Sequence, residues 1–180
     1  MPPWVDSSRA RGIEYDLRCA RALHRGAERP HVKRTLALVS HIGEAPFWMV
    51  LPMLMSWLDP VDGFRNALWF VELGALNLLI YWAVKRATRR ERPFRQCADI
   101  RECVRASDQF SFPSGHALHA VSFAVLLSVL YPVLAPALWT FALAVSASRV
   151  VLGVHYPSDV LAGAAIGAVT AGLLCMAFVL

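Results

Sequence analysis

The stretch SRVVLGVHYPSD, residues 148–159, directly follows a run of apolar residues. It places Arg149, His155 and Asp159 close together at the edge of a segment that is apolar enough to lie in a bilayer. Each charge that enters hydrocarbon costs several kcal/mol. The stretch therefore predicts that other groups, or a bound ligand, compensate these charges.

The chain around this stretch is strongly apolar. Of its 180 residues 57% are hydrophobic and 17% are charged, with a mean hydropathy of +0.45. These values are typical of a membrane protein rather than of a soluble domain. We expect an all-α fold, a polytopic transmembrane bundle of about five helices of roughly 20 residues each. The expected spans are residues 35–57, 64–84, 114–131, 133–151 and 160–180.

The first 34 residues carry eight Lys or Arg and four Asp or Glu, with no apolar run. They therefore indicate neither a signal peptide nor a spanning helix. Ile13, Leu17, Ala20 and Leu23 recur at helical spacing between arginines, which favours an amphipathic helix on the membrane surface over a frayed basic tail. We expect a surface segment at 1–34 and a membrane-embedded domain at 35–180.

The basic residues are unevenly divided between the two predicted membrane faces. Of the 18 Lys and Arg residues, 17 fall on the face that carries the N-terminal segment, and Arg65 alone falls opposite. The positive-inside rule then predicts that the crowded face is cytoplasmic, in a multi-pass protein of a bacterial inner membrane. Because an anion site also needs cations, a periplasmic location of this face stays the alternative.

Two further polar clusters border the same face. The first, KRATRRERP at residues 85–93, contains Lys85 and Arg92; the second is FPSGH at residues 112–116. Pro113 and Ser114 are helix-start signals, and Gly115 lets another group approach the backbone. The free N–H groups and the dipole of such a helix start bind anions, so His116 would stand beside a bound anion.

The third cluster is the opening stretch itself. Pro157 marks a helix start, so His155 and Asp159 lie four residues apart across a helix entry and can touch. An aspartate that accepts one imidazole N–H leaves the other nitrogen free as a base or nucleophile. With the cations of Lys85, Arg92 and Arg149 nearby, the three clusters suit a tetrahedral dianion and phosphoryl transfer.

The spacings K-x6-RP, PSGH and SR-x5-H-x3-D resemble the three-part signature of the type 2 phosphatidic acid phosphatase family, which includes the vanadium haloperoxidases. The resemblance implies that His155 attacks phosphorus to give a phosphohistidine, and that Asp159 orients its ring. It implies that His116 protonates the leaving oxygen and then activates water. It also implies a reaction with no metal or other cofactor. The phosphoryl oxygens would be held by five residues: Lys85, Arg92, Ser114, Gly115 and Arg149.

Five spans favour a lipid substrate whose tail stays in the bilayer, and nothing in the sequence indicates a nucleic-acid partner. Members of the family act on phosphatidic acid, phosphatidylglycerophosphate, lipid A phosphate and polyprenyl diphosphates. This compact chain resembles the small members that act on isoprenoid phosphates or diphosphates such as undecaprenyl diphosphate. A glycerophospholipid phosphatase is the alternative. A haloperoxidase or a catalytically dead lipid-binding protein is a more remote one.

Several other polar residues have ordinary interpretations. Arg86, Arg89, Arg90 and Arg95 are expected to anchor a span at the membrane interface. We expect His119 to be a packed polar residue, with a supporting role beside His116 as the alternative. Glu44 and Glu72 fall within predicted spans, where they either line a headgroup pocket or hydrogen-bond neighbouring helices.

Gly163 and Gly167 form a GxxxG pattern in the last predicted span, which favours helix packing inside the bundle. Cys97 and Cys103 share one polar loop and would pair only if that loop faced an oxidising compartment. Cys19 and Cys175 lie far apart in the sequence. The cysteines therefore do not predict a disulfide scaffold.

Overall fold

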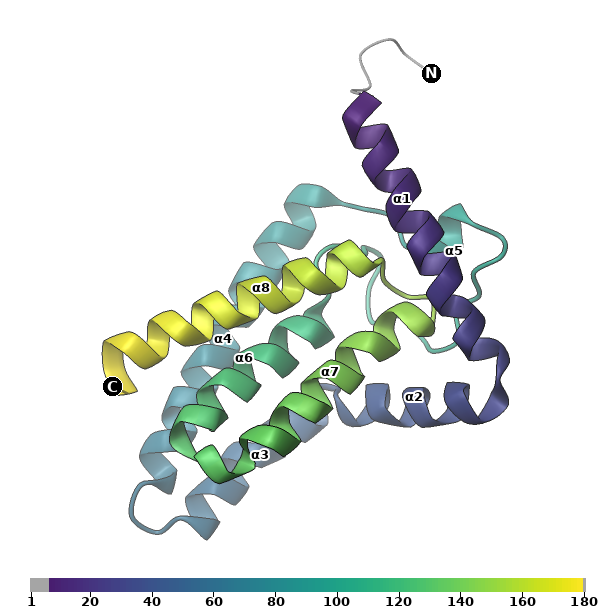
Figure 1. Ribbon diagram of the computed structural model, residues 1–180. Coiled ribbons are helices and arrows are strands. Elements are labelled where there is room, and N and C mark those ends of the chain that lie inside the picture. Colours follow the sequence, from purple (N-terminus) through teal and green to yellow (C-terminus); the bar gives the residue numbers. More distant parts are fainter. Residues whose placement is uncertain (1–6, 180) are drawn as a thin grey trace.

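A computed structural model describes residues 7–179, and every regular element among them is helical, which confirms the predicted fold class. Short 3-10 turns at Arg25–Glu28 and Pro132–Leu134 and a π-helical turn at Cys175–Val179 join or extend the α-helices. The α-helices (Figure 1) are α1 (Ser7–His24), α2 (Pro30–Ile42), α3 (Ala45–Leu58), α4 (Gly63–Thr88), α5 (Pro93–Gln96), α6 (Gly115–Leu130), α7 (Ala135–Val151) and α8 (Pro157–Leu174).

Prolines mark most of the helix starts. A proline occupies the first or second position of α2, α3, α5, α7 and α8. At these positions the missing N–H has no intrahelical partner to lose, and the fixed φ suits a helix. In α6 the start is instead set by Ser114, whose side chain caps the first turn. The sequence thus sets the places where the chain turns at each end of the bundle.

Helix α6 lies at the centre of the bundle, with α7 and α8 on either side and α4 behind it in Figure 1. Its apolar side chains are buried over most of its length. Phe123 stacks on Phe70 of α4 with ring centroids 3.9 Å apart, and it contacts Trp48 of α3 at 4.8 Å. This aromatic cluster fixes α3 and α4 against α6.

Helices α6 and α8 pack backbone against backbone. A Cβ atom on Gly163 would lie 2.4 Å from the carbonyl oxygen of Ser114, and one on Gly167 would lie 2.3 Å from that of Leu118. Only glycine permits this approach, so the predicted packing role of the GxxxG pattern is confirmed. The contact matters beyond stability because Ser114 opens α6 at the end that carries the polar motifs.

Replacing Gly163 by alanine should push α8 away from α6. We expect the free energy of unfolding to fall by about 1–3 kcal/mol, as for other overpacked contacts. Activity should fall by roughly 10²-fold, because a displacement near 1 Å separates the groups at the start of α6 from those at the start of α8. Thermal unfolding in detergent and turnover of a lipid phosphate measure the two effects.

Gly172→Ala, in the same helix, is the matched control. A Cβ atom at Gly172 meets nothing within 4 Å. This variant should therefore keep full activity and gain at most about 1 kcal/mol from helix propensity. Equal stability and activity of Gly163→Ala and Gly172→Ala would contradict the packing argument.

A polar network joins the three helices in the middle of the bundle. The side-chain amide of Asn77 in α4 donates to the Ser122 hydroxyl of α6 at 2.7 Å and accepts from the Thr170 hydroxyl of α8 at 2.7 Å. All three residues are buried. Hydrogen bonds between spanning helices are worth about 1 kcal/mol each, so this network adds specificity to the apolar packing.

The number of spans differs from the expectation of five. Within residues 7–179, three helices are long and apolar enough to cross a membrane, by length and composition alone, and α2 with α3 would make a fourth as one bent span. The bend of 55° falls where Gly43 and Glu44 interrupt the predicted span 35–57. Glu44 is therefore not inside a continuous helix, and its carboxylate contacts His41 at 3.3 Å. The remaining candidate, α6, is apolar but has only 16 residues.

The predicted N-terminal helix corresponds to α1, which buries two polar residues as well as one of the predicted apolar ones. Asp16, Ala20 and His24 are buried against the bundle, whereas Ile13 and Leu23 are half exposed. A helix periodicity in apolar residues alone could not identify a buried face that contains a carboxylate and an imidazole. The boundary expected at residues 34–35 falls inside α2. The location of α1 on a membrane surface stays a prediction.

Candidate active site

The residues of the three sequence motifs lie at one end of the bundle. They come from the last turns of α4 and α7, the loop beside α5, and the first turns of α6 and α8. In Figure 1 these ends face the side on which α1, α2 and α5 lie. The residues at this end are Lys85, Arg92, Ser114, Gly115, His116, Arg149, His155 and Asp159.

A carboxylate that the sequence analysis did not single out joins Lys85 to Arg92. Asp108 Oδ2 accepts from Lys85 Nζ at 2.7 Å, and Oδ1 accepts from Arg92 Nη2 at 3.1 Å. The Tyr81 hydroxyl donates to the same carboxylate and accepts from Lys85 at 2.7 Å. Lys85 and Arg92 are almost fully buried, so Asp108 holds both cations in place.

Burial by itself would raise the pKa of Asp108, but hydrogen bonds from Lys85 and Tyr81 outweigh it and hold the pKa below its ordinary value. Asp108 is therefore ionised at neutral pH. Lys85, Arg92 and Arg149 outnumber the carboxylate of Asp108, so these three cations keep an excess of positive charge. Such an excess favours the binding of a phosphate dianion.

His155 lies next to Arg92. Its Nε2 is 3.3 Å from Arg92 Nη1, and its Nδ1 is 3.5 Å from Asp159 Oδ2. Because a guanidinium only donates, Nε2 must present its lone pair to Arg92 and the ring proton must lie on Nδ1, toward Asp159. The contact to Asp159 is at the outer limit of a hydrogen bond, and Nδ1 has no closer partner.

The neutral form of this imidazole is strongly favoured. Complete burial lowers the pKa of His155 to about 4, and the charges of Arg92 and Arg149 act in the same direction, while Asp159 opposes them. At neutral pH the ring is therefore uncharged and Nε2 carries a lone pair, as a nucleophile requires. An anion bound among the same cations would reduce their effect on the pKa of His155 and lower the free energy of a positively charged ring.

Asp159 is fully buried and its carboxylate is well satisfied. Oδ2 accepts from the Ser111 hydroxyl and from the backbone N–H of Tyr156 at 2.8 Å. Oδ1 accepts from Arg90 Nη1 at 2.7 Å. The backbone carbonyl of Asp159 accepts from Ser114 N at 3.0 Å, which couples the start of α8 to the start of α6. These contacts fix the carboxylate that faces His155.

Three nitrogens at this end of the bundle are buried without a hydrogen-bond partner. Among the described residues, the buried side-chain atoms in this state are His116 Nε2, Ser146 Oγ, Arg149 Nε and His155 Nδ1. Arg149 also donates from Nη1 to the Ser40 hydroxyl of α2. Unpaired buried polar groups are costly, so Arg149 Nε and His116 Nε2 indicate that a ligand binds at this end, whereas His155 Nδ1 faces Asp159.

Ser114 and Gly115 also make contacts within the protein, and their predicted binding of phosphate stays a prediction. The Ser114 hydroxyl caps α6 through a long contact with Ala117 N at 3.5 Å, and its own N–H is used by Asp159. A Cβ atom on Gly115 would lie 2.8 Å from the ring of Tyr81, so the group that approaches this glycine closely is Tyr81. The glycine at position 115 predicted that another group approaches the backbone closely, but it did not identify Tyr81 as that group.

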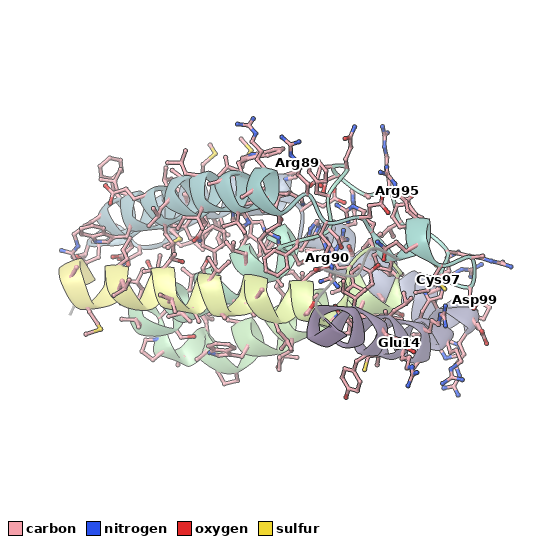
Figure 2. The ribbon with its side chains drawn as sticks, turned by 90° about the horizontal axis from the view of Figure 1, so that it is seen from above. Glu14, Arg89, Arg90, Arg95, Cys97 and Asp99 are labelled. Carbon is pink, nitrogen blue, oxygen red and sulfur yellow. The ribbon has the colours of Figure 1, made fainter. Side chains whose placement is uncertain are left out.

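The expectation for Arg90 was wrong. Its side chain is 23% exposed and bonds Asp159 and Asp16, so it is not a free interface anchor. In Figure 2 Arg90 lies between α4 and α8, whereas Arg89 and Arg95 lie toward the outer side of the protein. Arg86, Arg89 and Arg95 are exposed, as expected of surface residues. A run of arginines does not reveal which member points inward.

The remaining candidates lie apart from the motif residues or pack beside them. His119 Nδ1 is 2.9 Å from the Gly115 carbonyl and its ring packs near Phe123, which confirms a packed polar residue. Glu72 is exposed on the outer face of α4. The four cysteines are free, and Cys97 is buried beside Arg21 Nε at 2.9 Å. Residues 7–179 contain no cluster of His, Cys, Asp or Glu that could hold a metal ion.

This geometry agrees with the comparison to known proteins, in which residues 66–179 match the PAP2 superfamily. The chain belongs to this family. It is 38% identical over 141 residues to decaprenylphosphoryl-5-phosphoribose phosphatase of Mycolicibacterium smegmatis, covering 76% of this chain and 74% of the relative. The protein of the same name from Mycobacterium tuberculosis is 33% identical over 150 residues, covering 82% of this chain and 81% of the relative.

Solved structures share the architecture of this PAP2 protein. A transmembrane PAP2-type phosphatidylglycerolphosphate phosphatase from Bacillus subtilis aligns with a TM-score of 0.67 at 26% identity, covering 87% of this chain and 82% of that one. LpxE of Aquifex aeolicus aligns with a TM-score of 0.78 at 20% identity, covering 89% and 94%. The protein is thus an integral-membrane lipid phosphatase of the PAP2 family.

Proposed function

We propose that this PAP2 protein removes a terminal phosphate from a polyprenyl-linked lipid through a phosphohistidine on His155. The observation that carries the proposal is the buried, unprotonated Nε2 of His155, which lies 3.3 Å from Arg92. The proposed nucleophile, His155, and a cation suited to bind phosphate, Arg92, are thus in contact. The unpaired nitrogens of His116 and Arg149 belong to the same end of the bundle.

In the first step the phosphate dianion is held by Lys85, Arg92 and Arg149. His155 Nε2 forms a bond to phosphorus as the bond from phosphorus to the lipid oxygen breaks. The bound dianion offsets the nearby cations and favours protonated His116, which transfers its proton to that oxygen, so the lipid leaves as an alcohol. Asp159 offsets the positive charge that develops on the ring of His155, since its carboxylate faces Nδ1.

In the second step His116, now neutral, accepts a proton from water. The water oxygen bonds to phosphorus as the bond from phosphorus to His155 Nε2 breaks, which releases inorganic phosphate and restores the free imidazole. Residues that act as acid in one step and base in the next need no external proton donor. The cations of Arg92 and Arg149 stay in contact with the phosphoryl oxygens throughout.

The substrate class follows from two considerations. Exposed apolar side chains on α3, α4 and α8 indicate that the bundle is surrounded by lipid, so a long apolar tail can stay in the bilayer. The curated relatives from two mycobacteria are both named for decaprenylphosphoryl-5-phosphoribose. This favours a phosphate carried on a polyprenyl-linked sugar over the undecaprenyl diphosphate expected from the sequence, which becomes a comparator.

A substrate panel with purified protein in detergent tests this assignment. It compares a polyprenylphosphoryl pentose 5-phosphate with undecaprenyl diphosphate, phosphatidic acid, phosphatidylglycerophosphate and a tail-free pentose 5-phosphate. We expect kcat/KM for the first lipid to exceed the others by about tenfold or more. A higher value for either glycerophospholipid would replace the polyprenyl assignment, and absence of phosphate release from every lipid would refute the reaction itself.

The same proposal includes an orientation. The basic residues concentrate at the end that carries the motifs, which favours a cytoplasmic site. Cys103 is partly exposed at this end, whereas Cys97 is buried, so Cys103 is the useful reporter. A membrane-impermeant thiol reagent should leave Cys103 unlabelled in intact cells and label it after permeabilisation. Labelling in intact cells that Cys103→Ser removes would place the site outside.

A further inference from the structure

Asp16 is a buried carboxylate of α1, far in sequence from the motifs. Its side chain is 10% exposed. Oδ1 accepts from the backbone N–H of Ser158 at 3.1 Å, while Oδ2 accepts from the Ser158 hydroxyl and from Arg90 Nη2 at 2.6 Å. A buried charge is costly unless it is paired, so these contacts compensate the carboxylate of Asp16.

Arg90 connects Asp16 to Asp159. One guanidinium nitrogen, Nη2, bonds Asp16, and the other, Nη1, bonds Asp159 Oδ1 at 2.7 Å and the Ser158 hydroxyl at 2.7 Å. The guanidinium also lies 4.0 Å from the ring centre of Tyr156. A planar fork held on both sides has little freedom. The position in which Arg90 presents its positive charge to Asp159 therefore depends on Asp16.

Asp16, Arg90, Asp159 and His155 form a chain of ion pairs whose charges balance when the ring of His155 is positive. With a neutral imidazole, Asp16 and Asp159 outnumber Arg90 by one negative charge. When phosphorus bonds to His155 and the ring becomes positive, the chain becomes neutral. Without Asp16, Arg90 would already neutralise Asp159, and a positive His155 would lack compensation. In a buried site such an imbalance raises the free energy of the intermediate.

We propose that Asp16 is a positioning residue of this phosphatase, which acts through Arg90 to keep Asp159 oriented and able to stabilise a positively charged His155. The inference rests on the proposed phosphohistidine mechanism. It makes α1 part of the catalytic apparatus, although none of the sequence motifs lies in this helix. Asp16 touches no reacting atom, and its effect on the reaction passes through two other side chains.

A purely structural role must be separated from this one, because Asp16 also holds α1 to the start of α8. The rate constant of a single turnover, measured at saturating enzyme, distinguishes the positioning role from the structural one. An unfolded fraction lowers the amount of competent enzyme but leaves that rate constant unchanged. A weaker substrate site would raise KM, since Lys85, Arg92 and Arg149 hold the phosphate.

The measurement uses the full-length protein in detergent and a radiolabelled lipid phosphate. We expect Asp16→Asn to lower the single-turnover rate constant about tenfold while KM changes less than about twofold. Glu14→Gln is the matched control, because Glu14 lies on the same helix, is exposed and pairs only with Arg18 among the contacts described. This control should keep the wild-type rate constant.

Arg90→Gln supplies the second comparison. If Asp16 acts through Arg90, Asp16→Asn should change the rate constant by less than about twofold in the Arg90→Gln background. An unchanged rate constant in Asp16→Asn, a rise in KM alone, or an equal tenfold loss in both backgrounds would overturn the inference. A wild-type enzyme without turnover would instead refute the proposed function, so the two failures are distinguishable.

Discussion

His155→Ala should lose phosphate release by about 10⁴-fold or more in kcat, because no other group can supply the attacking lone pair. His155 Nε2 lies beside Arg92 and is buried, so water cannot easily take its place at phosphorus. Phosphate release from a lipid phosphate measures the loss. The wild-type enzyme, quenched in alkali after mixing with radiolabelled substrate, should carry label, since a phosphorus–nitrogen bond survives alkali and breaks in acid.

The matched control is His31→Ala. His31 is exposed in the first turn of α2, so its removal should leave turnover and labelling unchanged. Thermal unfolding should show that His155→Ala is folded. A kcat of His155→Ala within about tenfold of the wild-type value would refute the covalent mechanism. General acid–base groups alone would then account for the rate of phosphate release. Label on His155→Ala would show that another residue is phosphorylated.

The sequence was most informative where a motif and a helix end coincide. The FPSGH motif and Pro157 predicted the helix starts of α6 and α8, and GxxxG predicted helix packing inside the bundle, which the structure assigns to α6 and α8. The sequence was least informative about the predicted span at residues 35–57, because the apolar composition of this segment hides the break at Gly43 and Glu44. Hydropathy measures composition over a window, whereas the break depends on a few backbone angles.

The motif residues were identified from spacing, but their supporting partners were not. Asp108 and Arg90 bond to motif residues and Asp16 bonds to Arg90, yet each sits in a segment whose composition is typical of a charged surface. Which member of a charged run points inward depends on tertiary packing, here on Arg90 lying over Tyr156. Asp108 carried one signal: it is an acid in the loop that joins the cluster of Lys85 and Arg92 to the FPSGH cluster.

His116→Ala should lower turnover of an alkyl phosphate by about 10³-fold, which is the usual range for a lost general acid and base. The alcohol of a lipid or sugar is a poor leaving group, so it requires the proton that His116 supplies. His116 opens α6 and its Nε2 is buried without a protein partner, so this nitrogen is available for the leaving oxygen. Both chemical steps should slow together on the lipid substrate.

p-Nitrophenyl phosphate separates the two steps, because p-nitrophenolate departs without a proton. With this substrate His116→Ala should release p-nitrophenol in a rapid burst of about one equivalent and then stop, because water lacks its base and the phosphoenzyme accumulates. His119→Ala, one turn along α6, is the control; its ring packs near Phe123, so it should turn over without a burst. An equal loss on both substrates would mean that His116 positions the phosphate rather than transfers a proton.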